Sequence, residues 1–531
     1  MARIIVYGGG FAGVAAAAKA ASKAPNHSVI LISPYPDDML GGIGTSGGQN
    51  YWDVLTWPSG KHTACGSFTF WNDTYPLYYG VNEMSQLLKS SLGKYLNVSV
   101  YLSHDICEFK TSNNPFCITS VTVKKIYRDT DGNIKWGISS LAFAGDVFID
   151  ASDDGRLARM INTAVSTGRY DWPAGKLDPI EQNKDFLAMQ QAATLMFKMT
   201  GVNVNAKGNM YFSQSAKGLW GCWGGTEAFQ NPFGPIVSFN NQHAQSGYMI
   251  KPVNAAQDGT GSPNWWINAL MVFNVDGRAH FRDKGTAFYP TKMISGSKST
   301  DEAWIDTRLF LHTYRAEFER AMRSYPGFEN ASLVYSAGYP DVGTVLYLRE
   351  TVHMSKSSTS RANGTEDTNY AVAATASLNA GSAPNNGKDA ANYKSRIGLA
   401  MYYADVHPYK FTDVRNGSQY IWGADSWAKM RSDRPVVNPT MPQNPVYLPY
   451  SCLITAYVAN LLIPGYAAGV SSYSWGEVRV FPNLCVLGDA AGVAAAYSVN
   501  KKISALEISW SDIHIKAIQN DLINVSARLD K

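Results

Sequence analysis

The chain has 531 residues, of which 45% are hydrophobic and 17% charged, so it is long enough to bury a large core in more than one domain. Its formal net charge of +4 is small for this length, and no block of Lys and Arg occurs, which argues against nucleic acid as a partner. The six cysteines are far apart and form no CxxC pair, so the spacing predicts neither a disulfide framework nor a metal site.

The chain begins with an apolar strand that runs into a turn rich in glycine. Gly8, Gly10 and Gly13 satisfy G-x-G-x-x-G, and an Ala-rich helix is expected over 11–23, followed by an apolar strand over 28–33. Such a turn leaves backbone N–H groups free at a helix start, where a pyrophosphate can bind. The segment therefore predicts a right-handed βαβ unit that binds a dinucleotide.

A second glycine-rich segment, residues 40–48 (LGGIGTSGG), follows the βαβ unit directly. So many glycines predict a backbone that passes close to a flat or charged group, with a flexible loop as the alternative. Further along, a hairpin turn is expected at 129–133 (DTDGN), and residues 146–150 are expected to return as a buried strand. The expected strands of a small antiparallel meander are 97–102, 118–126 and 135–144.

The middle of the chain, from about 165 to 440, has weaker patterns. Helices are expected near 184–199 and 301–324, and residues 356–392 are expected to form a long surface loop or lid because they are rich in Ser, Asn, Gly and Thr. Aromatic residues are frequent, which favours a sizeable apolar or ring-shaped substrate, with core packing as the alternative. The tryptophans that motivate this hypothesis are Trp220, Trp223, Trp265 and Trp266.

The C-terminal region contains a second candidate for a strand, a glycine turn and a helix. Residues 484–492 read LCVLGDAAG, and an Ala-rich stretch follows them. One cofactor held by both ends of the chain explains this element and the N-terminal turn together, and FAD is the cofactor that this arrangement favours. Residues 450–470 lack charge, but Pro464 and Gly465 interrupt them, so a strand and a turn are expected there rather than a membrane span. A closing helix or two is expected over 503–531.

These segments resemble the FAD-dependent oxidoreductases of the glutathione-reductase-like fold. The likeness is carried, in order, by residues 8–13, 40–48, 146–158 (DVFIDASDDGRLA), 348–351 (LRET) and the block from 449 to 492 with its PY, NLL, RVFP and GDAAG stretches. The resemblance implies an α/β fold with a Rossmann-like FAD-binding domain, in which a parallel sheet is joined by the small meander. The implied domains are 1–165 with 440–531 for FAD, and an inserted α+β substrate or cap domain over 166–439.

The resemblance also implies the residues that hold the cofactor. The pyrophosphate would lie on Gly8, Gly10 and Gly13, and the isoalloxazine beside Gly41, Gly42 and Thr45. Asp489 would contact the ribityl and phosphate region, with Gly488 and Gly492 at the start of a helix that faces the flavin pyrimidine. A structural helix cap is the alternative for Asp489.

Two departures from the family pattern affect the cofactor site. Ser33 ends the second strand where Glu or Asp usually binds the ribose, so either Ser33 takes that role or Asp37 or Asp38 reaches in. The family's Ala-Thr-Gly-Asp-Gly stretch is Ala-Ser-Asp-Asp-Gly here, in which Ser152 keeps the hydroxyl and Asp153 restricts the turn.

Catalytic candidates come from two segments. Asp405 and His407 resemble a family D-x-H segment, and in an extended strand both point to one face, so Asp405 can orient His407 as a general base or acid near flavin N5. Arg349 and Glu350 are expected toward the active site, with a buried ion pair as the alternative. Tyr450 is a weaker candidate for proton donation, and a structural role stays the alternative for His407. His62 and His353 are further candidates without supporting context.

The function that these features favour is hydride transfer between a small organic substrate and FAD. A flavin monooxygenase or halogenase is the first alternative, although no second G-x-G-x-x-G indicates a nicotinamide domain. An FAD-stabilised binding protein without activity is the second. We expect a small-molecule substrate, and no nucleic acid, membrane or metal as a partner. We also expect a cytoplasmic protein that can form a homo-oligomer. No signal peptide is expected, because the first residues already form a strand.

Overall fold

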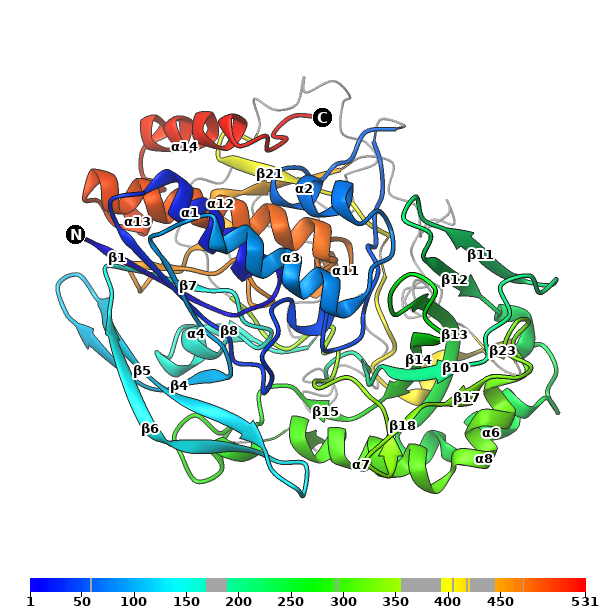
Figure 1. Ribbon diagram of the computed structural model, residues 1–531. Helices are drawn as coiled ribbons and strands as arrows, with labels where there is room; N and C mark the ends of the chain where they lie inside the picture. Colours follow the sequence, from blue (N-terminus) through cyan, green and yellow to red (C-terminus); the bar gives the residue numbers. More distant parts are fainter. Residues whose placement is uncertain are drawn as a thin grey trace.

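The structure is a computed structural model, and it describes residues 1–57, 60–168, 189–291, 293, 296–354, 393–403, 405–416, 419–420, 445–470 and 472–531. The expected loop or lid over 356–392 lies outside the described residues. Two sheets dominate the described part, a parallel one near the N-terminus and an antiparallel one in the middle of the chain (Figure 1).

The parallel sheet has five described strands in the order β25-β7-β1-β2-β3. It confirms the expected βαβ unit, because β1 and β2 pair in parallel on either side of helix α1. Four of the five residues in each of these two strands are buried, as expected for strands covered on both faces. The elements are β1 Arg3–Tyr7, α1 Phe11–Lys23, β2 Ser28–Ile32, β3 Val98–Tyr101, β7 Val147–Asp150 and β25 Leu461–Leu462.

The antiparallel meander forms, but with different strands from those expected. Strand β3 lies in the parallel sheet beside β2, so the assignment of 97–102 to the meander is wrong. Helix α3, Val81–Gly93, precedes β3, and a helical crossover returns the chain in the same direction as the previous strand. The meander has the order β4-β5-β6, and its turn closes with Gly132 N–H donating to the Asp129 carbonyl at 3.1 Å. Its strands are β4 His104–Ser112, β5 Cys117–Arg128 and β6 Ile134–Ala144.

The C-terminal strand, turn and helix expected at 484–492 are one continuous helix, and that expectation is wrong. Helix α12, Phe481–Lys501, begins after Val480 and has a proline in its first turn. Nearly every residue along it is buried, so its apolar run shows no polar face and imitates a buried strand. Figure 1 shows α12 lying beside α1. A Cβ on Gly488 or Gly492 would come within 2.2 or 2.3 Å of the Ala12 or Ala16 carbonyl oxygen, so these glycines permit close helix packing.

The C-terminal part nevertheless contributes a strand to the parallel sheet. Leu461 and Leu462 of β25 pair with Phe148 and Ile149 of β7. Both ends of the chain therefore build this sheet, through residues 461–462 instead of 484–487. The segment over 450–470 contains this strand and turns, as expected, but begins with a 3-10 helix over Tyr450–Leu453. None of the described helices combines the length and apolar character that crossing a membrane requires.

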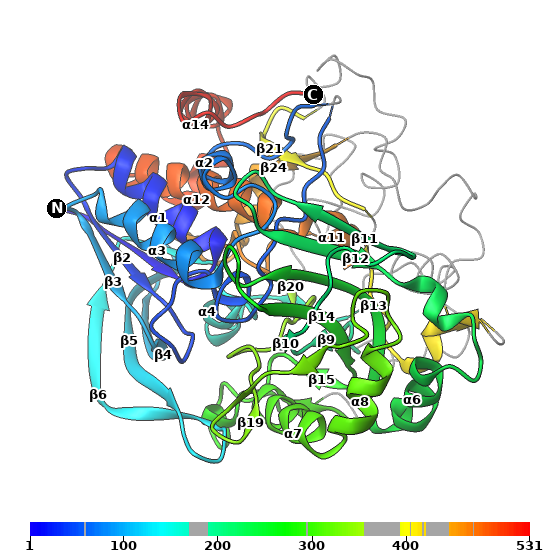
Figure 2. The ribbon, with the colours of Figure 1, turned by 45° about the vertical axis from the view of Figure 1, so that its right-hand side comes forward.

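The antiparallel sheet has the order β11-β12-β13-β14-β10-β17, with β9 paired to β14. Helices α7 and α8 confirm the expectation for 301–324, and with α6 they pack against one face of this sheet (Figure 2). The helix expected near 184–199 is wrong for the described residues from 189 onward, which form β9 and β10 because their alternating apolar side chains pair with β14. The elements are β9 Ala193–Thr194, β10 Phe197–Thr200, β11 Met210–Gln214, β12 Trp220–Gly224, α6 Pro235–His243, β13 Tyr248–Gln257, β14 Asn264–Val272, α7 Thr300–Thr313, α8 Arg315–Met322 and β17 Ser332–Leu333.

The other face of the antiparallel sheet meets the glycine-rich segment of the first domain. Asn50 donates its side-chain amide to the Gln257 carbonyl at 2.8 Å, and a Cβ on Gly48 would lie 2.5 Å from the Trp266 ring. Closing helices form at the C-terminus as expected. Further elements are α2 Ser67–Thr74, α4 Arg156–Met160, β8 Val165–Ser166, β15 Val275–Asp276, β16 Lys298–Ser299, β18 Tyr335–Ser336, β19 Tyr339–Pro340, β20 His353–Met354, β21 Arg396–Ala400, β22 Arg415–Asn416, β23 Gln419–Tyr420, β24 Val446–Pro449, α11 Ser472–Val478, α13 Ala505–Ile508 and α14 Asp512–Asn524.

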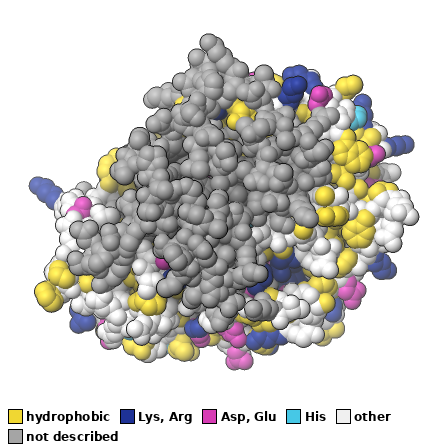
Figure 3. Space-filling model, turned by 180° about the vertical axis from the view of Figure 1, so that it is seen from behind, with side chains coloured by type: hydrophobic (Ala, Val, Ile, Leu, Met, Phe, Trp, Pro, Cys, Tyr) yellow, Lys and Arg dark blue, Asp and Glu magenta, His cyan; other side chains and the backbone are white. Residues whose placement is uncertain are grey.

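The surface seen from behind carries charges of both signs. On the coloured part of this face, Lys and Arg side chains alternate with Asp, Glu and hydrophobic ones instead of gathering in one block (Figure 3). The candidate site residues lie in the interior, where the two sheets meet.

Candidate active site

The glycine turn after β1 has the geometry of a phosphate-binding helix start. Gly8 has φ +118°, and a Cβ there would lie 2.4 Å from the Ala151 carbonyl oxygen, so the position requires glycine. A Cβ on Gly13 would lie 1.8 Å from the Gly8 carbonyl oxygen. Helix α1 begins after Gly10 without a side-chain cap. Its positive end is therefore open to an anion.

The second glycine segment packs directly on this turn. Gly41 N–H donates to the Gly9 carbonyl at 2.8 Å, and Gly41 itself lies in the left-handed region at φ +110°. The Thr45 hydroxyl donates to the Leu40 carbonyl at 2.8 Å, which holds the loop in its tight form. The structure thus brings together two of the three segments that the sequence assigned to the cofactor.

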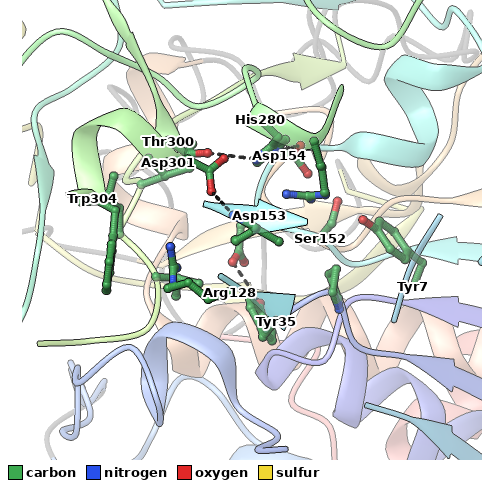
Figure 4. Close-up of a pocket in the computed structure, with 16 residues that line it drawn as sticks. Tyr7, Tyr35, Arg128, Ser152, Asp153, Asp154, His280, Thr300, Asp301 and Trp304 are labelled. Carbon is green, nitrogen blue, oxygen red and sulfur yellow. Dashed lines mark hydrogen bonds and ion pairs between the residues drawn. The ribbon is translucent and has the colours of Figure 1, made fainter. Parts of the chain in front are cut away.

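A cavity of about 80 Å³ opens at the carboxyl ends of β1, β2 and β7 (Figure 4). In an open parallel sheet, ligands bind at this edge. Tyr35 lies across the edge and donates its hydroxyl to Asp153 at 2.9 Å. Burial raises the pKa of Asp153 to about 7. Residues of the middle of the chain form the opposite wall, and they include His280, Thr300, Asp301 and Trp304.

Ser33 is the ribose candidate with hydrogen-bonding capacity to spare. Its hydroxyl is buried at the end of β2 and has no partner within the described part of the chain. Asp37 accepts from the Ser46 and Thr344 hydroxyls at 2.8 and 2.9 Å, so it anchors the glycine loop, and Asp38 is exposed. Ser152 is engaged as well, because its hydroxyl donates to Asp150 at 2.6 Å and accepts from the Arg156 N–H at 3.1 Å.

A group of buried ion pairs, here called the Asp105 network, lies behind this cavity. Asp105 accepts from the Tyr7 hydroxyl at 2.6 Å and from Arg282 Nε at 2.7 Å, and it lies 3.2 Å from Arg156 Nε. Arg156 also donates to Asp283, with Nη2 2.9 Å from Oδ1. Burial would raise the pKa of Asp283, but Arg156 outweighs burial and holds that pKa at about 2. Each charge in this network is matched by an opposite one.

A second buried charged group, here called the Arg349 cluster, lies where the two sheets meet. Its members are Arg349, Arg479, Asp405, His407 and Lys251. Arg479 Nη2 is 2.5 Å from Asp405 Oδ2, and Asp405 Oδ1 is 3.5 Å from His407 Nε2. Lys251 donates to the Asn268 carbonyl at 3.0 Å, and Arg349 donates to the Ala192 carbonyl at 2.8 Å. Strand β13 presents Lys251 at a break in its register with β14.

Burial lowers the pKa values of three basic groups in this cluster and so favours their neutral forms. Burial and then Arg349 lower the pKa of Lys251 to about 7 and that of His407 to about 3. Burial and Arg479 lower the pKa of Arg349 to about 10. Burial would raise the pKa of Asp405, but Arg479 and His407 outweigh it and hold that pKa well below its usual range. Asp405 is therefore ionised and His407 neutral at pH 7.

Several polar atoms of the cluster have unused hydrogen-bonding capacity. His407 Nδ1, Arg349 Nε and Arg479 Nε are buried, and no described residue is a hydrogen-bond partner of any of the three. The His407 backbone N–H is held by the Gln191 side-chain oxygen at 2.8 Å. Buried polar atoms without partners are uncommon and mark a site that receives a ligand or moves a proton.

The structure places Arg349 and His407 in one cluster, and the other catalytic candidates have partners of their own. Glu350 Oε1 lies 3.3 Å from His353 Nε2, so the two form a buried pair of their own. The Tyr450 hydroxyl donates to the Ala505 carbonyl at 2.8 Å in the core, and burial raises its pKa. His62 lies beside Asn72 on α2, at 3.5 Å.

The predicted cofactor contact at Asp489 loses its basis, because this residue lies in the third turn of α12 and not at the apex of a turn. Its carboxylate accepts from the Ser67 N–H at 2.8 Å and from the Ser67 hydroxyl at 2.5 Å, which fixes the start of α2. Gly488 and Gly492 contact α1, as described above. The helix end that the sequence placed near residue 490 lies at Val480–Phe481, and Phe481 packs on Phe11 with ring centroids 5.0 Å apart.

An aromatic cavity of about 330 Å³ lies next to the Arg349 cluster. The segment after the glycine loop, the antiparallel sheet and the segment before His407 contribute to its wall. Tyr402, in that segment, donates its hydroxyl to Asp53 at 2.9 Å. Of the four tryptophans expected near a substrate, Trp223 lines the cavity, whereas Trp265 lies in the core and Trp266 packs on the glycine loop. The main side chains of the wall are Tyr51, Trp52, Asp53, Tyr78, Trp223, Asn254, Tyr402 and Tyr403.

Sequence reasoning missed Lys251, Arg479 and Asp53 as site residues. Lys251 had a usable signal, since it is a lone charge in the apolar strand sequence YMIKPVNAA. Arg479 was noted only as part of a family segment, and Asp53 had no distinctive context. In the described part of the chain, no three His, Cys, Asp or Glu side chains gather in a way that could hold a metal ion.

The fold and the site define a dinucleotide-binding α/β protein with a buried polar centre between two sheets. The chain belongs to the FAD dependent oxidoreductase family, whose model matches residues 3–522. Its cofactor is accordingly FAD. A search of curated proteins found no match.

Solved structures of flavin enzymes resemble the chain weakly. The p-nitrophenol 4-monooxygenase PnpA from Pseudomonas putida DLL-E4 is 11% identical, with 63% of this chain and 66% of that chain covered and a TM-score of 0.28. THI4 from Thermovibrio ammonificans is 13% identical, with 31% and 64% covered and a TM-score of 0.22. The myxobacterial chondrochloren halogenase CndH is 13% identical, with 51% and 53% covered and a TM-score of 0.26. The chain thus spans less than two thirds of each of these structures.

The residues present fit FAD at the pyrophosphate and ribose positions. The uncapped start of α1 offers backbone donors beside a turn that only glycine can form. Ser33 offers a buried hydroxyl without a partner among the described residues, at the strand end where the family places its ribose contact. The assignment of FAD to this site therefore rests on the geometry of the βαβ unit as well as on the family match.

Proposed function

We propose that the chain oxidises a small organic substrate by moving a hydride from a substrate C–H bond to FAD at the Arg349 cluster. The observation that carries the proposal is the neutral His407, whose Nδ1 has no partner among the described residues and whose other ring nitrogen faces the ionised Asp405. When an alcohol gives up a hydride, its O–H proton must also leave, and a neighbouring base can accept it.

The proposed cofactor contacts follow the geometry of the first domain. Gly8, Gly10 and Gly13, with the start of α1, would hold the pyrophosphate, and Ser33 would contact a ribose. The loop that contains Gly41, Gly42 and Thr45 would lie beside the isoalloxazine. FAD supplies the hydride acceptor when it is bound. Residues 1–165 and 440–531 are the proposed FAD domain.

His407 would act as the base. Asp405, held ionised by Arg479, lies 3.5 Å from Nε2 and would favour the tautomer with the proton there, which leaves the lone pair on Nδ1. The pKa of His407, lowered to about 3, keeps the ring unprotonated at neutral pH, so Nδ1 has a free lone pair, and the ring would hold a substrate proton only transiently. Asp405 then stabilises the charged ring that forms. This is the role of an orienting carboxylate beside a general base.

Arg349, Arg479 and Lys251 would stabilise negative charge that develops beside them. Fixed cations at a largely buried site act strongly on such charge, because the surrounding dielectric screens them little. Residues 166–439, the proposed substrate domain, supply Lys251, His407 and Trp223 to this centre. Glu350 and Tyr450 stay outside it, and we propose structural roles for both.

The test is anaerobic mixing of the FAD-loaded protein with a panel of amines, alcohols and compounds with activated C–C bonds. The proposal expects one class to bleach the flavin absorbance without any nicotinamide present. Flavin reduction by NAD(P)H alone, followed by oxygen consumption and a hydroxylated or halogenated product, would contradict it and favour a monooxygenase or halogenase. A protein that binds no flavin after reconstitution would contradict it as well.

A further inference from the structure

We propose that the aromatic cavity binds an organic cation, a molecule with a flat or apolar body that carries a protonated amine, and that Asp53 is its counter-ion. This inference rests on the proposed function and names the substrate class for it. The cavity adjoins the Arg349 cluster, because Asp53 and Tyr402 line it and Tyr402 lies in the segment that leads to His407.

The polar atoms of several wall residues are already engaged with the protein. Tyr78 shares a hydrogen bond with the Ser213 hydroxyl at 2.6 Å, and the Trp52 indole N–H donates to the Tyr75 carbonyl at 3.0 Å. The Tyr51 hydroxyl accepts from the Asn268 amide at 3.0 Å. These side chains therefore offer the cavity ring surface rather than hydrogen bonds, which suits an apolar or aromatic body and also a cation over a ring.

Asp53 is the charged side chain among the described residues that line the cavity. Its carboxylate is fixed by the Tyr402 hydroxyl at 2.9 Å and by the Gln49 amide at 3.2 Å, and it is partly accessible from the cavity. Carboxylate oxygens have more than one lone pair each, so Asp53 can accept further donors. A protonated amine supplies both the donors and the opposite charge.

The volume of the cavity limits the size of the substrate. A cavity of about 330 Å³ lies at the lower end of the range of small-molecule sites, roughly 300–1,000 Å³. One ring with a short side chain fits this space, whereas a nucleotide or an oligosaccharide does not.

The chemistry balances for such a substrate. The ammonium group would first lose one proton to solvent. The carbon next to nitrogen would then give up a hydride, which is two electrons and one proton, and bound FAD would supply the acceptor. The C–H bond would break and a second C–N bond would form, so the amine would become an iminium ion. The co-reactant is the family's own cofactor.

The experiment measures binding separately from oxidation. Isothermal titration calorimetry of the oxidised, FAD-loaded protein is carried out with benzyltrimethylammonium, which has a permanent charge and no N–H proton to lose. Benzyl alcohol and benzoate serve as neutral and anionic counterparts. We expect the cation to bind at least about tenfold more tightly than either, and Asp53→Asn to remove this preference. The matched control is Asp129→Asn, on a surface hairpin, which should keep it.

Two outcomes would overturn the inference. One is benzoate or benzyl alcohol binding as tightly as the cation, and the other is a preference for the cation that survives Asp53→Asn. Failure of the proposed function is distinguishable. Cation binding that depends on Asp53 supports the site even if no compound of the whole panel bleaches the flavin, in which case the hydride-transfer proposal fails. Flavin bleaching by an alcohol without cation binding overturns the inference and keeps the proposed function.

Discussion

The protein contains two groups of buried charges that differ in how they are matched. In the Asp105 network, Asp105 and Asp283 are each paired with guanidinium groups, and the pKa of Asp283 falls to about 2 because Arg156 outweighs burial. In the Arg349 cluster, burial outweighs pairing for Lys251 and His407, whose pKa values fall to about 7 and about 3. The Asp105 network therefore stays charged at pH 7, whereas His407 is neutral and Lys251 is partly neutral in the Arg349 cluster.

The difference separates a structural role from a reactive one. Paired buried charges cannot be removed singly without a large penalty, and they have no capacity left for a ligand. Lys251, whose pKa burial lowers to about 7, can accept or give a proton near pH 7. His407 Nδ1 and Arg349 Nε also have no partner among the described residues, whereas the charges of the Asp105 network are matched. We therefore assign a catalytic role to the Arg349 cluster and a stabilising role to the Asp105 network.

The largest expected effect is on catalysis, in His407→Asn. Loss of a general base typically slows a reaction by about 10²–10⁴-fold, so the rate of flavin reduction by substrate should fall by that factor. The measurement is anaerobic stopped-flow absorbance on the FAD-loaded variant. His243→Asn is the control, because His243 is also buried beside a carboxylate, at 3.3 Å from Glu317, but lies on helix α6, which covers the opposite face of the antiparallel sheet from the glycine loop. Equal rates in His407→Asn and the wild type would assign His407 a structural role.

The second effect is on stability, in Arg156→Met. Removing one partner of a buried ion pair leaves an uncompensated charge and costs about 3–5 kcal/mol. We expect the free energy of unfolding in urea to fall by this amount, while the protein that remains folded keeps its rate of flavin reduction. A fall below about 1 kcal/mol would show that the network is solvated and that the contrast between the two groups is weaker than the distances indicate.

The third effect is a change of stability with pH that depends on Lys251. The pKa of this amine is about 7 in the folded state and has its ordinary value of 10.5 in the unfolded chain, so the unfolded chain binds more protons between these values. Wild-type stability should therefore rise relative to Lys251→Met as the pH increases from 7 to 9, by on the order of 2 kcal/mol. Urea unfolding of both proteins at the two pH values measures it. A difference that does not vary with pH would mean that Lys251 is charged throughout.

The smallest effect is expected from Tyr7→Phe. The Tyr7 hydroxyl donates to Asp105 at 2.6 Å, but Arg156 and Arg282 also neutralise this carboxylate. A hydrogen bond to a charged group contributes about 1.5–3 kcal/mol, and the remaining partners should keep the loss near the lower value. Thermal unfolding of the variant beside Arg156→Met tests this order. A larger loss in Tyr7→Phe than in Arg156→Met would contradict the view that ion pairing dominates the network.

Local sequence patterns were sufficient to predict the N-terminal βαβ unit. The glycine turn, α1 and the two apolar strands follow from spacing and composition, and the structure contains them as expected. Helix α12 could not be recognised in the same way, because a helix buried on all sides shows no polar face and its apolar run imitates a strand. Strand β3 shows the same limit, since its partner is set by the preceding helix and not by its own residues.

The candidate site could be predicted only in part. His407 and Arg349 were found through short segments with a family likeness, and the structure places both in one cluster. Lys251 and Arg479 come from distant parts of the chain and meet the other two only after both domains have folded, so no local spacing indicates them. Asp489 shows the opposite error, because a sequence match suggested a cofactor contact where the side chain holds Ser67.

The most direct test is a crystal structure of the FAD-loaded protein. We predict that the pyrophosphate lies at the start of α1, and that the isoalloxazine lies between the glycine loop over 40–48 and the Arg349 cluster, open to the aromatic cavity. An isoalloxazine ring bound in the cavity of Figure 4, beside Asp153 and His280, would contradict the assignment of chemistry to the Arg349 cluster.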